Sequence, residues 1–287
     1  MDKIQTHHFS SKKERTVKKM KVYPKLDDAF AGVNVLKEYV KDGLELQLLH
    51  KISNKLNRTI STYKAMFPDL KEITLHYSMM ECDLGIPLCN DVAFEKLISD
   101  ITYISGLAEA HSVKINLLLH VQDKYDLVIA RGLKSKLARL KEYLERFNIL
   151  LLLENVIDVN GALDCKEHAL EFVRGMETEN IKCCLDICHI RCYLNKFNFD
   201  ESILEEYLGT DLNRLVYQIH FADTWDNDGF KDFKTHAKYH SRKSFEHDIN
   251  LLKRLNIDDK IIITEIVEFD NNYEHRECQL KELQLFR

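Results

Sequence analysis

The chain has 287 residues, and an apolar share of 45% is enough to build a substantial core. Lys and Arg number 41 against 46 Asp and Glu, which gives a formal net charge of −5. This balance excludes the overall basicity of proteins that bind nucleic acid chiefly through phosphates. Nine glycines and three prolines are too few for a turn-rich sandwich or a disordered chain, so a helix-rich α/β protein remains.

The N-terminal 1–19 segment is polar and lysine-rich, and it lacks the apolar core of a signal peptide. No stretch approaches the roughly 20 apolar residues of a membrane span. We therefore expect a cytoplasmic protein without a membrane partner. No linker or repeat divides the sequence, so residues 1–287 are interpreted as a single domain. Eight cysteines are too dilute for a disulfide framework and are expected to be reduced thiols.

Short apolar runs, typical of parallel strands buried on both faces, alternate with amphipathic stretches along the chain. Eight strands are predicted, at residues 20–23, 44–48, 73–75, 115–119, 149–153, 181–185, 215–219 and 261–264. Helical periodicity is clearest over residues 94–110 and 133–147. Eight strand–helix units in about 250 residues predict an α/β fold, the (β/α)₈ TIM barrel. An open doubly wound sheet is disfavoured because no glycine-rich turn follows the first strand.

Six consecutive predicted strands end in a residue that can bind a metal. In chain order these residues are His76, His120, Glu154, Asp186, His220 and Glu265. The carboxyl ends of all strands open onto one face of a TIM barrel, so the six side chains should converge there. Imidazoles and carboxylates that converge in a partly buried mouth would repel one another or stay unsatisfied without a cation. The pattern therefore predicts a divalent metal site.

Four short runs carry a resemblance to a known group of barrels. They are Leu153–Asn155, Cys184–His189, Ile219–Asp223 and Ile263–Glu265. Together they resemble the signatures of the xylose isomerase-like TIM barrel superfamily, which includes endonuclease IV (AP endonuclease family 2) and many sugar isomerases and epimerases. Each run alone is a weak signal, but the ordered set extends from His76 to Glu265, one run to each strand.

The resemblance implies a shared metal site built from Glu154, Asp186, His220 and Glu265. It implies that His76 and His120 hold an additional metal in the endonuclease IV branch. His189 matches a residue that binds a third metal in endonuclease IV and contacts substrate in the epimerases. The implied cofactor is Mn²⁺ or Zn²⁺, and Mg²⁺, Co²⁺ or Fe²⁺ would also suit mixed imidazole and carboxylate ligands.

The stretch 232–240 departs from the endonuclease IV pattern, because it has no glycine. His236 and His240 are four residues apart and would share one face if this stretch were helical. His236 is proposed as a metal ligand and His240 as a substrate-binding residue, with exposed loop histidines as the alternative. Trp225 is proposed to form a wall of the substrate pocket, with a position that merely covers the barrel rim as the alternative. The series Cys184, Cys188, Cys192 is interpreted as buried thiols, not as a thiolate metal site. Glu45, in the middle of a predicted strand, receives no role.

The leading hypothesis is a sugar or sugar-phosphate isomerase or epimerase that works through a metal-stabilised enediolate, with Glu154 and Glu265 as acid and base and His189 on a substrate hydroxyl. The alternative is an endonuclease IV-like phosphodiesterase that uses two or three metals on DNA, the only case with a DNA partner. A non-catalytic metal-binding barrel is a third class. The sequence leaves open whether the protein forms a homodimer.

Overall fold

The computed structural model describes residues 20–48, 54–77, 91–120, 129–155, 173, 178–197, 200–202, 212–223, 236, 238–254, 260–266 and 273–285. The 1–19 segment and Trp225 lie outside these residues. Among the described helices, none is long and apolar enough to cross a membrane.

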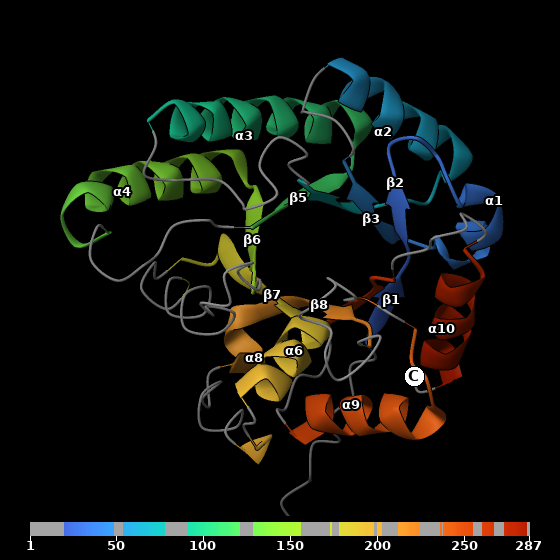
Figure 1. The fold of residues 1–287 in the computed structure, drawn as a ribbon. Helices are drawn as coiled ribbons and strands as arrows, with labels where there is room; N and C mark the ends of the chain where they lie inside the picture. Colours follow the sequence, from blue (N-terminus) through green and yellow to red (C-terminus); the bar gives the residue numbers. More distant parts are fainter. Residues whose placement is uncertain are drawn as a thin grey trace, which may run out of the picture.

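Nine parallel strands form the barrel (Figure 1). They are β1 (Lys21–Tyr23), β2 (Lys25–Asp27), β3 (Gly43–Gln47), β4 (Glu72–His76), β5 (Lys114–Leu119), β6 (Leu150–Glu154), β7 (Ile181–Asp186), β8 (Val216–Phe221) and β9 (Ile261–Thr264). Their order around the sheet is β1-β9-β8-β7-β6-β5-β4-β3-β2. Neighbours are thus consecutive in the chain except where β1 meets β9. The predicted TIM barrel is confirmed.

The structure has one strand more than the eight predicted, because Pro24 divides the first strand in two. Proline has no N–H to donate to a ladder. Before it, β1 pairs with β9, and after it, β2 pairs with β3. The backbone N–H of Glu45 donates to the Pro24 carbonyl at 3.0 Å, so the ring of strands closes at this residue.

A glycine makes this closure compact. A Cβ on Gly43, the first residue of β3, would lie 2.1 Å from the Tyr23 ring of β1. Only the absence of a side chain lets the aromatic ring pack directly against the β3 backbone. The side chain of Tyr23 is buried, so the packing seals the barrel between its first and third strands.

Helices surround the strands (Figure 1). They are α1 (Val33–Leu36), the 3₁₀ turn η1 (Lys37–Tyr39), α2 (Asn54–Met66), α3 (Asp91–His111), α4 (Ile129–Phe147), α6 (Ile187–Phe197), α8 (Leu212–Leu215), α9 (Arg242–Arg254) and α10 (Glu274–Leu285). The two helices with the clearest periodicity, α3 and α4, are confirmed. In α4, Leu140 and Leu144 are fully buried at i, i+4 spacing and anchor the helix on the barrel.

Polar side chains fill part of the barrel interior, where bulky aliphatic residues usually dominate. Thr74 Oγ1 donates to Gln218 Oε1 at 3.0 Å, and Asn116 Nδ2 lies 3.3 Å from Thr74 Oγ1 and 2.9 Å from Glu72 Oε1. Gln218 Nε2 then donates to Glu45 Oε2 at 2.6 Å. We call Glu72, Thr74, Asn116 and Gln218 the interior polar layer. It links the amino ends of the strands to the carboxyl-end mouth through hydrogen bonds.

Candidate metal centre

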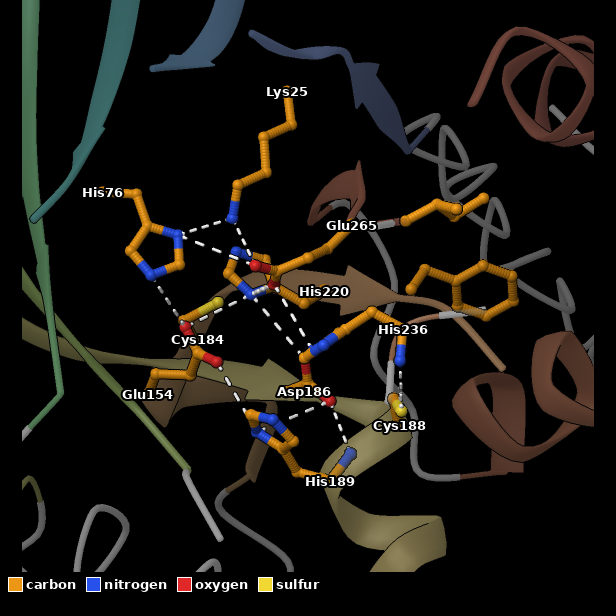
Figure 2. Close-up of polar contacts among 12 residues, drawn as sticks. Lys25, His76, Glu154, Cys184, Asp186, Cys188, His189, His220, His236 and Glu265 are labelled. Carbon is orange, nitrogen blue, oxygen red and sulfur yellow. Dashed lines mark hydrogen bonds and ion pairs between the residues drawn. The ribbon is translucent and has the colours of Figure 1, made fainter. Parts of the chain in front are cut away.

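The six predicted strand-end residues meet in the mouth of the barrel. His76, Glu154 and Asp186 are the last residues of β4, β6 and β7, His120 and Glu265 directly follow β5 and β9, and His220 lies one residue before the end of β8. The labelled members of this group point toward one another in Figure 2. This convergence follows from the parallel register of the strands, because each strand delivers its last side chain to the same face.

The Nδ1 atom of His220 is the centre of the group. Glu154 Oε2 lies 3.3 Å from it, Asp186 Oδ2 lies 3.8 Å from it, and Glu265 Oε2 is in direct contact. Of the four residues that the resemblance assigns to the shared metal site, Glu154, His220 and Glu265 are close enough to hold an ion together, with His76 as the fourth member of that group. Asp186 lies beside this group and is close enough to Glu154 and His189 to hold an ion with them. His220 Nδ1, Glu154 Oε2 and Glu265 Oε2 are buried and have no hydrogen-bond partner. Three orphaned ligand atoms that face one another fit a divalent cation.

The electrostatics of the mouth also favour a cation. Burial alone would lower the pKa of His220, but Cys184 and the carboxylates of Glu265 and Glu45 raise it well above its ordinary value. The carboxylates are thus numerous enough to draw a proton onto a completely buried imidazole. A divalent ion at His220 Nδ1 would satisfy the same negative potential without the proton.

His76 and His120 form the edge of the mouth next to Glu154. Their Nε2 atoms lie 3.2 Å apart, and Glu154 Oε2 lies 3.7 Å from the first and 3.2 Å from the second. The two residues implied to hold a further metal in the endonuclease IV branch therefore do come together with a carboxylate.

His236 reaches the mouth from outside the strands. Its Nε2 lies 3.1 Å from Asp186 Oδ2, and its backbone N–H donates to Cys188 Sγ at 3.1 Å. Burial would lower the pKa of His236, but the carboxylates of Glu265 and Asp186 raise it to about 9. Asp186, Cys188 and His236 are close enough to hold an ion as a group. The backbone at His236 is left-handed, with a φ of 60°, which turns its ring toward the barrel.

His189 lies in the first turn of α6, beside the metal position. Its Nδ1 is 2.7 Å from the Asn155 carbonyl oxygen and 3.6 Å from Glu154 Oε1, and its backbone N–H donates to Asp186 Oδ1 at 2.6 Å. Since a carbonyl only accepts, Nδ1 carries a proton, and in the neutral ring Nε2 then keeps its lone pair. His189 is thus oriented as a hydrogen-bond acceptor.

Comparisons with known proteins show which structures share this fold. No family model and no curated protein matches the chain in sequence. Solved structures match along nearly its whole length. A D-tagatose 3-epimerase-like protein is 18% identical with a TM-score of 0.62, covering 92% of this chain and 97% of its own. An AP endonuclease, family 2, from Brucella melitensis is 12% identical with a TM-score of 0.62 (93% and 99%). The IOLI protein with a bound zinc atom is 12% identical with a TM-score of 0.60 (92% and 97%). The fold is also similar to that of proteins described as xylose isomerase domain or xylose isomerase-like TIM barrel proteins.

Two predicted substrate residues lie apart from the mouth cluster or cannot be placed. Residues 236 and 238–240 are not helical and α9 begins only at Arg242, so the condition under which His236 and His240 would share a helical face is not met. His240 is bonded through Nδ1 to Asp223 at 2.7 Å and its side chain is 72% exposed. Trp225 lies outside the described residues.

The cysteine series does not form one site. Cys184 packs with Leu118 and Leu152, whereas Cys188 and Cys192 belong to a separate apolar cluster. All three are free and buried, as predicted. Burial raises the pKa of the Cys184 thiol to about 12, so it stays protonated.

The sequence analysis assigned no role to two residues of the mouth. Glu45 is completely buried and contacts two histidines of the mouth. Its Oε1 lies 2.9 Å from His76 Nδ1, and its Oε2 lies 2.8 Å from His220 Nε2. Carboxylates that hold the far nitrogen of a metal-binding histidine fix its orientation. The second residue, Lys25, directs its ammonium at Glu45, Glu265 and His76. The available signal was a charge within an apolar run at Glu45 and a lysine directly after Pro24.

Proposed function

We propose that the protein is a divalent-metal-dependent isomerase or epimerase that acts on a small sugar or sugar phosphate. One observation carries the proposal: Glu154 and Glu265 each direct one orphaned oxygen to His220 Nδ1. They come from β6 and β9, two strands separated by β7 and β8. Two carboxylates that flank one cation position from different sides can exchange a proton with either face of a substrate held between them.

The ligands that would hold the ion are Glu154, Asp186, His220 and Glu265. When bound, a divalent ion supplies Lewis-acid polarisation of substrate oxygens, which acidifies the adjacent C–H bond. The epimerase-like and zinc-containing structural neighbours support this chemistry. Glu45 would keep His220 correctly turned, because it occupies the Nε2 side of the ring.

The proton steps fall to this chain's own side chains. One glutamate removes the proton from the carbon next to the substrate carbonyl, and the C–H electron pair becomes part of an enediolate. The other glutamate returns a proton to that carbon from its own side, which inverts the centre, or to the neighbouring carbon, which moves the carbonyl. His189 can accept a hydrogen bond from a substrate hydroxyl at Nε2, because Nδ1 is held by Asn155.

The alternative, phosphodiester cleavage at abasic DNA, is favoured by one observation. The Nε2 atoms of His76 and His120 converge on Glu154 Oε2, as a second cation for in-line displacement would require. An AP endonuclease of family 2 is among the structural neighbours.

A solvent-exchange experiment tests the proposal. Wild-type protein loaded with Mn²⁺ is incubated in ²H₂O with a panel of ketoses and ketose phosphates, and deuterium at carbon is followed by NMR. We expect exchange into at least one substrate. Glu154→Gln and Glu265→Gln should each slow it by about 10³-fold, the size of a lost general acid or base. Glu95→Gln, on the exposed face of α3, is the matched control and should leave exchange unchanged.

Two results would contradict the proposal. Full exchange in both glutamine variants would remove these residues from the proton path. Metal-dependent incision of a labelled duplex at a single abasic site, with no exchange into any sugar, would favour the alternative function.

A further inference from the structure

Lys25 is a buried cation in the barrel mouth that none of the proposed proton steps uses. It is the first residue of β2, directly after Pro24, and it is paired in register with Glu45 on β3. Its side chain is 4% exposed and extends into the mouth (Figure 2). A fully buried ammonium is tolerated only where opposite charges and hydrogen bonds offset its desolvation.

The Nζ atom of Lys25 lies where three ligand-type atoms converge. Glu45 Oε1 is 2.9 Å away, His76 Nδ1 is 2.7 Å away, and Glu265 Oε1 is in direct contact. Two carboxylate oxygens and an imidazole nitrogen are the kind of group that binds a divalent ion. Here an ammonium of the chain itself takes that place, next to the proposed metal ligands.

The ammonium also decides which nitrogen of His76 carries the proton. An ammonium can only donate, so His76 Nδ1 must accept its hydrogen bond. A neutral imidazole with Nδ1 as acceptor carries its hydrogen on Nε2. That nitrogen faces His120 Nε2 and Glu154 Oε2, the position of the second metal in the alternative function. A protonated Nε2 has no lone pair for a metal.

Glu45 would impose the opposite state. Its Oε1 lies 2.9 Å from the same Nδ1 and only accepts, so without Lys25 it would take the proton of His76 on Nδ1. Nε2 would then be free to bind an ion together with His120 and Glu154. The carboxylate–histidine–metal arrangement of this kind is common around metal sites.

We propose that Lys25 is a built-in second cation: it holds His76 in the form that cannot bind metal and so limits the His220-centred mouth to one divalent ion. The inference rests on the proposed function, which needs only the ion at His220. It assigns His76 and His120 to the wall of the substrate site. Lys25 is accordingly a positioning residue, since it acts through His76 and Glu265.

Metal counting with Mn²⁺ as the probe tests this role. Bound Mn²⁺ per chain is measured by elemental analysis after equilibrium dialysis, and the electron paramagnetic resonance spectrum reports whether two ions are exchange-coupled. Removing His76 from the wild type, by His76→Ala, should leave the count unchanged. Lys25→Met should gain one ion and show the coupled spectrum, and adding His76→Ala to it should remove that ion again. Lys25→Arg keeps the cation and should behave as wild type, and Lys253→Met on α9 is the matched control.

Each outcome separates this inference from the proposed function. A wild-type protein that loses an ion on His76→Ala binds metal through His76, either in a second site or in the group that His76 forms with Glu154, His220 and Glu265, and this overturns the role of Lys25 even if Lys25→Met does not fold. A folded Lys25→Met that gains no ion overturns it too. Absence of any bound Mn²⁺ in the wild type contradicts the metal centre and with it the proposed function, whereas sugar exchange by a two-metal wild type would overturn only the role of Lys25.

Discussion

The mouth and the interior polar layer beneath it treat buried polar groups in opposite ways. In the mouth, Glu154 Oε2, His220 Nδ1 and Glu265 Oε2 face one another without hydrogen bonds. In the interior polar layer, Thr74 and Gln218 are hydrogen-bonded to each other by side-chain groups, and Asn116 Oδ1 is a single buried atom without a partner. A largely satisfied buried network adds rigidity, while a cluster of unsatisfied ligand atoms that face one another is costly until something binds there. The comparison favours a framework role for the layer and supports the proposed ion site in the mouth.

Glu45 joins the two regions. One of its oxygens accepts from Gln218 of the interior polar layer and contacts His220 Nε2, and the other meets Lys25 and His76. Burial would raise the pKa of Glu45, but His220, Lys25 and His76 lower it well below its ordinary value, so the residue is a carboxylate. The orientation of the His220 ring is therefore fixed from the framework side.

Metal removal should have the largest effect on stability, because only the mouth depends on an ion. A ligand at 1,000 times its Kd stabilises the native state by about 4 kcal/mol. At ~2 °C per kcal/mol for a large domain, a chelator should lower the Tm by roughly 8 °C, and Mn²⁺ should restore it. Differential scanning calorimetry of the wild type and Glu265→Gln measures this. A variant that kept the full response to Mn²⁺ would show that the ion binds elsewhere.

Asn116→Leu should lower the stability of the protein by less than metal removal does. Unlike metal removal, its effect should not depend on Mn²⁺. The change removes the amide that donates to Glu72 and Thr74 in the interior polar layer and leaves those acceptors buried. Glu72 keeps Lys114 and Tyr217 as partners and Thr74 keeps Gln218, so the expected cost is that of the lost hydrogen bonds, about 0.5–1.5 kcal/mol each. Urea unfolding should therefore show lower stability with or without chelator, while the response to Mn²⁺ stays that of the wild type. A loss of Mn²⁺ response in this variant would erase the distinction between framework and ion site.

Strand-end ligands could be predicted from the sequence, because an apolar run followed by His, Asp or Glu places a side chain at the barrel mouth whatever the rest of the chain does. Lys25 could not. Its partner Glu265 is 240 residues away, and the lysine points into the mouth only because Pro24 transfers the first strand from β9 to β3. Sequence patterns describe local periodicity, not the closure of a barrel.

The interior polar layer was missed for a different reason. Asn116 and Gln218 each lie one or two residues inside runs that are otherwise apolar, which is the pattern of a strand buried on both faces. Their hydrogen bonds join strands that are distant in the sequence; Thr74 and Gln218, for example, are 144 positions apart. His236 was proposed as a metal ligand, but its contact with Asp186 depends on a left-handed backbone in an irregular segment, which the sequence pattern does not predict. Neither periodicity nor composition encodes such contacts.

The smallest expected effect is a pH dependence of stability that is caused by Glu72, a member of the interior polar layer. Burial would raise the pKa of Glu72, but the Lys114 ammonium and the hydrogen bonds from Tyr217 and Asn116 lower it below the ordinary value of 4.5. A carboxylate whose pKa is lower in the folded state stabilises fully above its unfolded pKa, and this contribution is lost as the pH falls through the folded pKa. The wild type should therefore lose stability more steeply than Glu72→Gln as the pH falls below about 4.5.

Urea midpoints at pH 6, 5, 4 and 3.5 measure this difference, with chelator present so that acid release of metal from the mouth does not contribute. At pH 6 the wild type should be the more stable protein, because Glu72→Gln has no charge to pair with Lys114. The gap should narrow toward pH 3.5 as Glu72 takes up its proton. Parallel curves over the whole range would mean that Glu72 has the same pKa folded and unfolded. In that case the interior polar layer would hold Glu72 by its hydrogen bonds alone, whatever its charge.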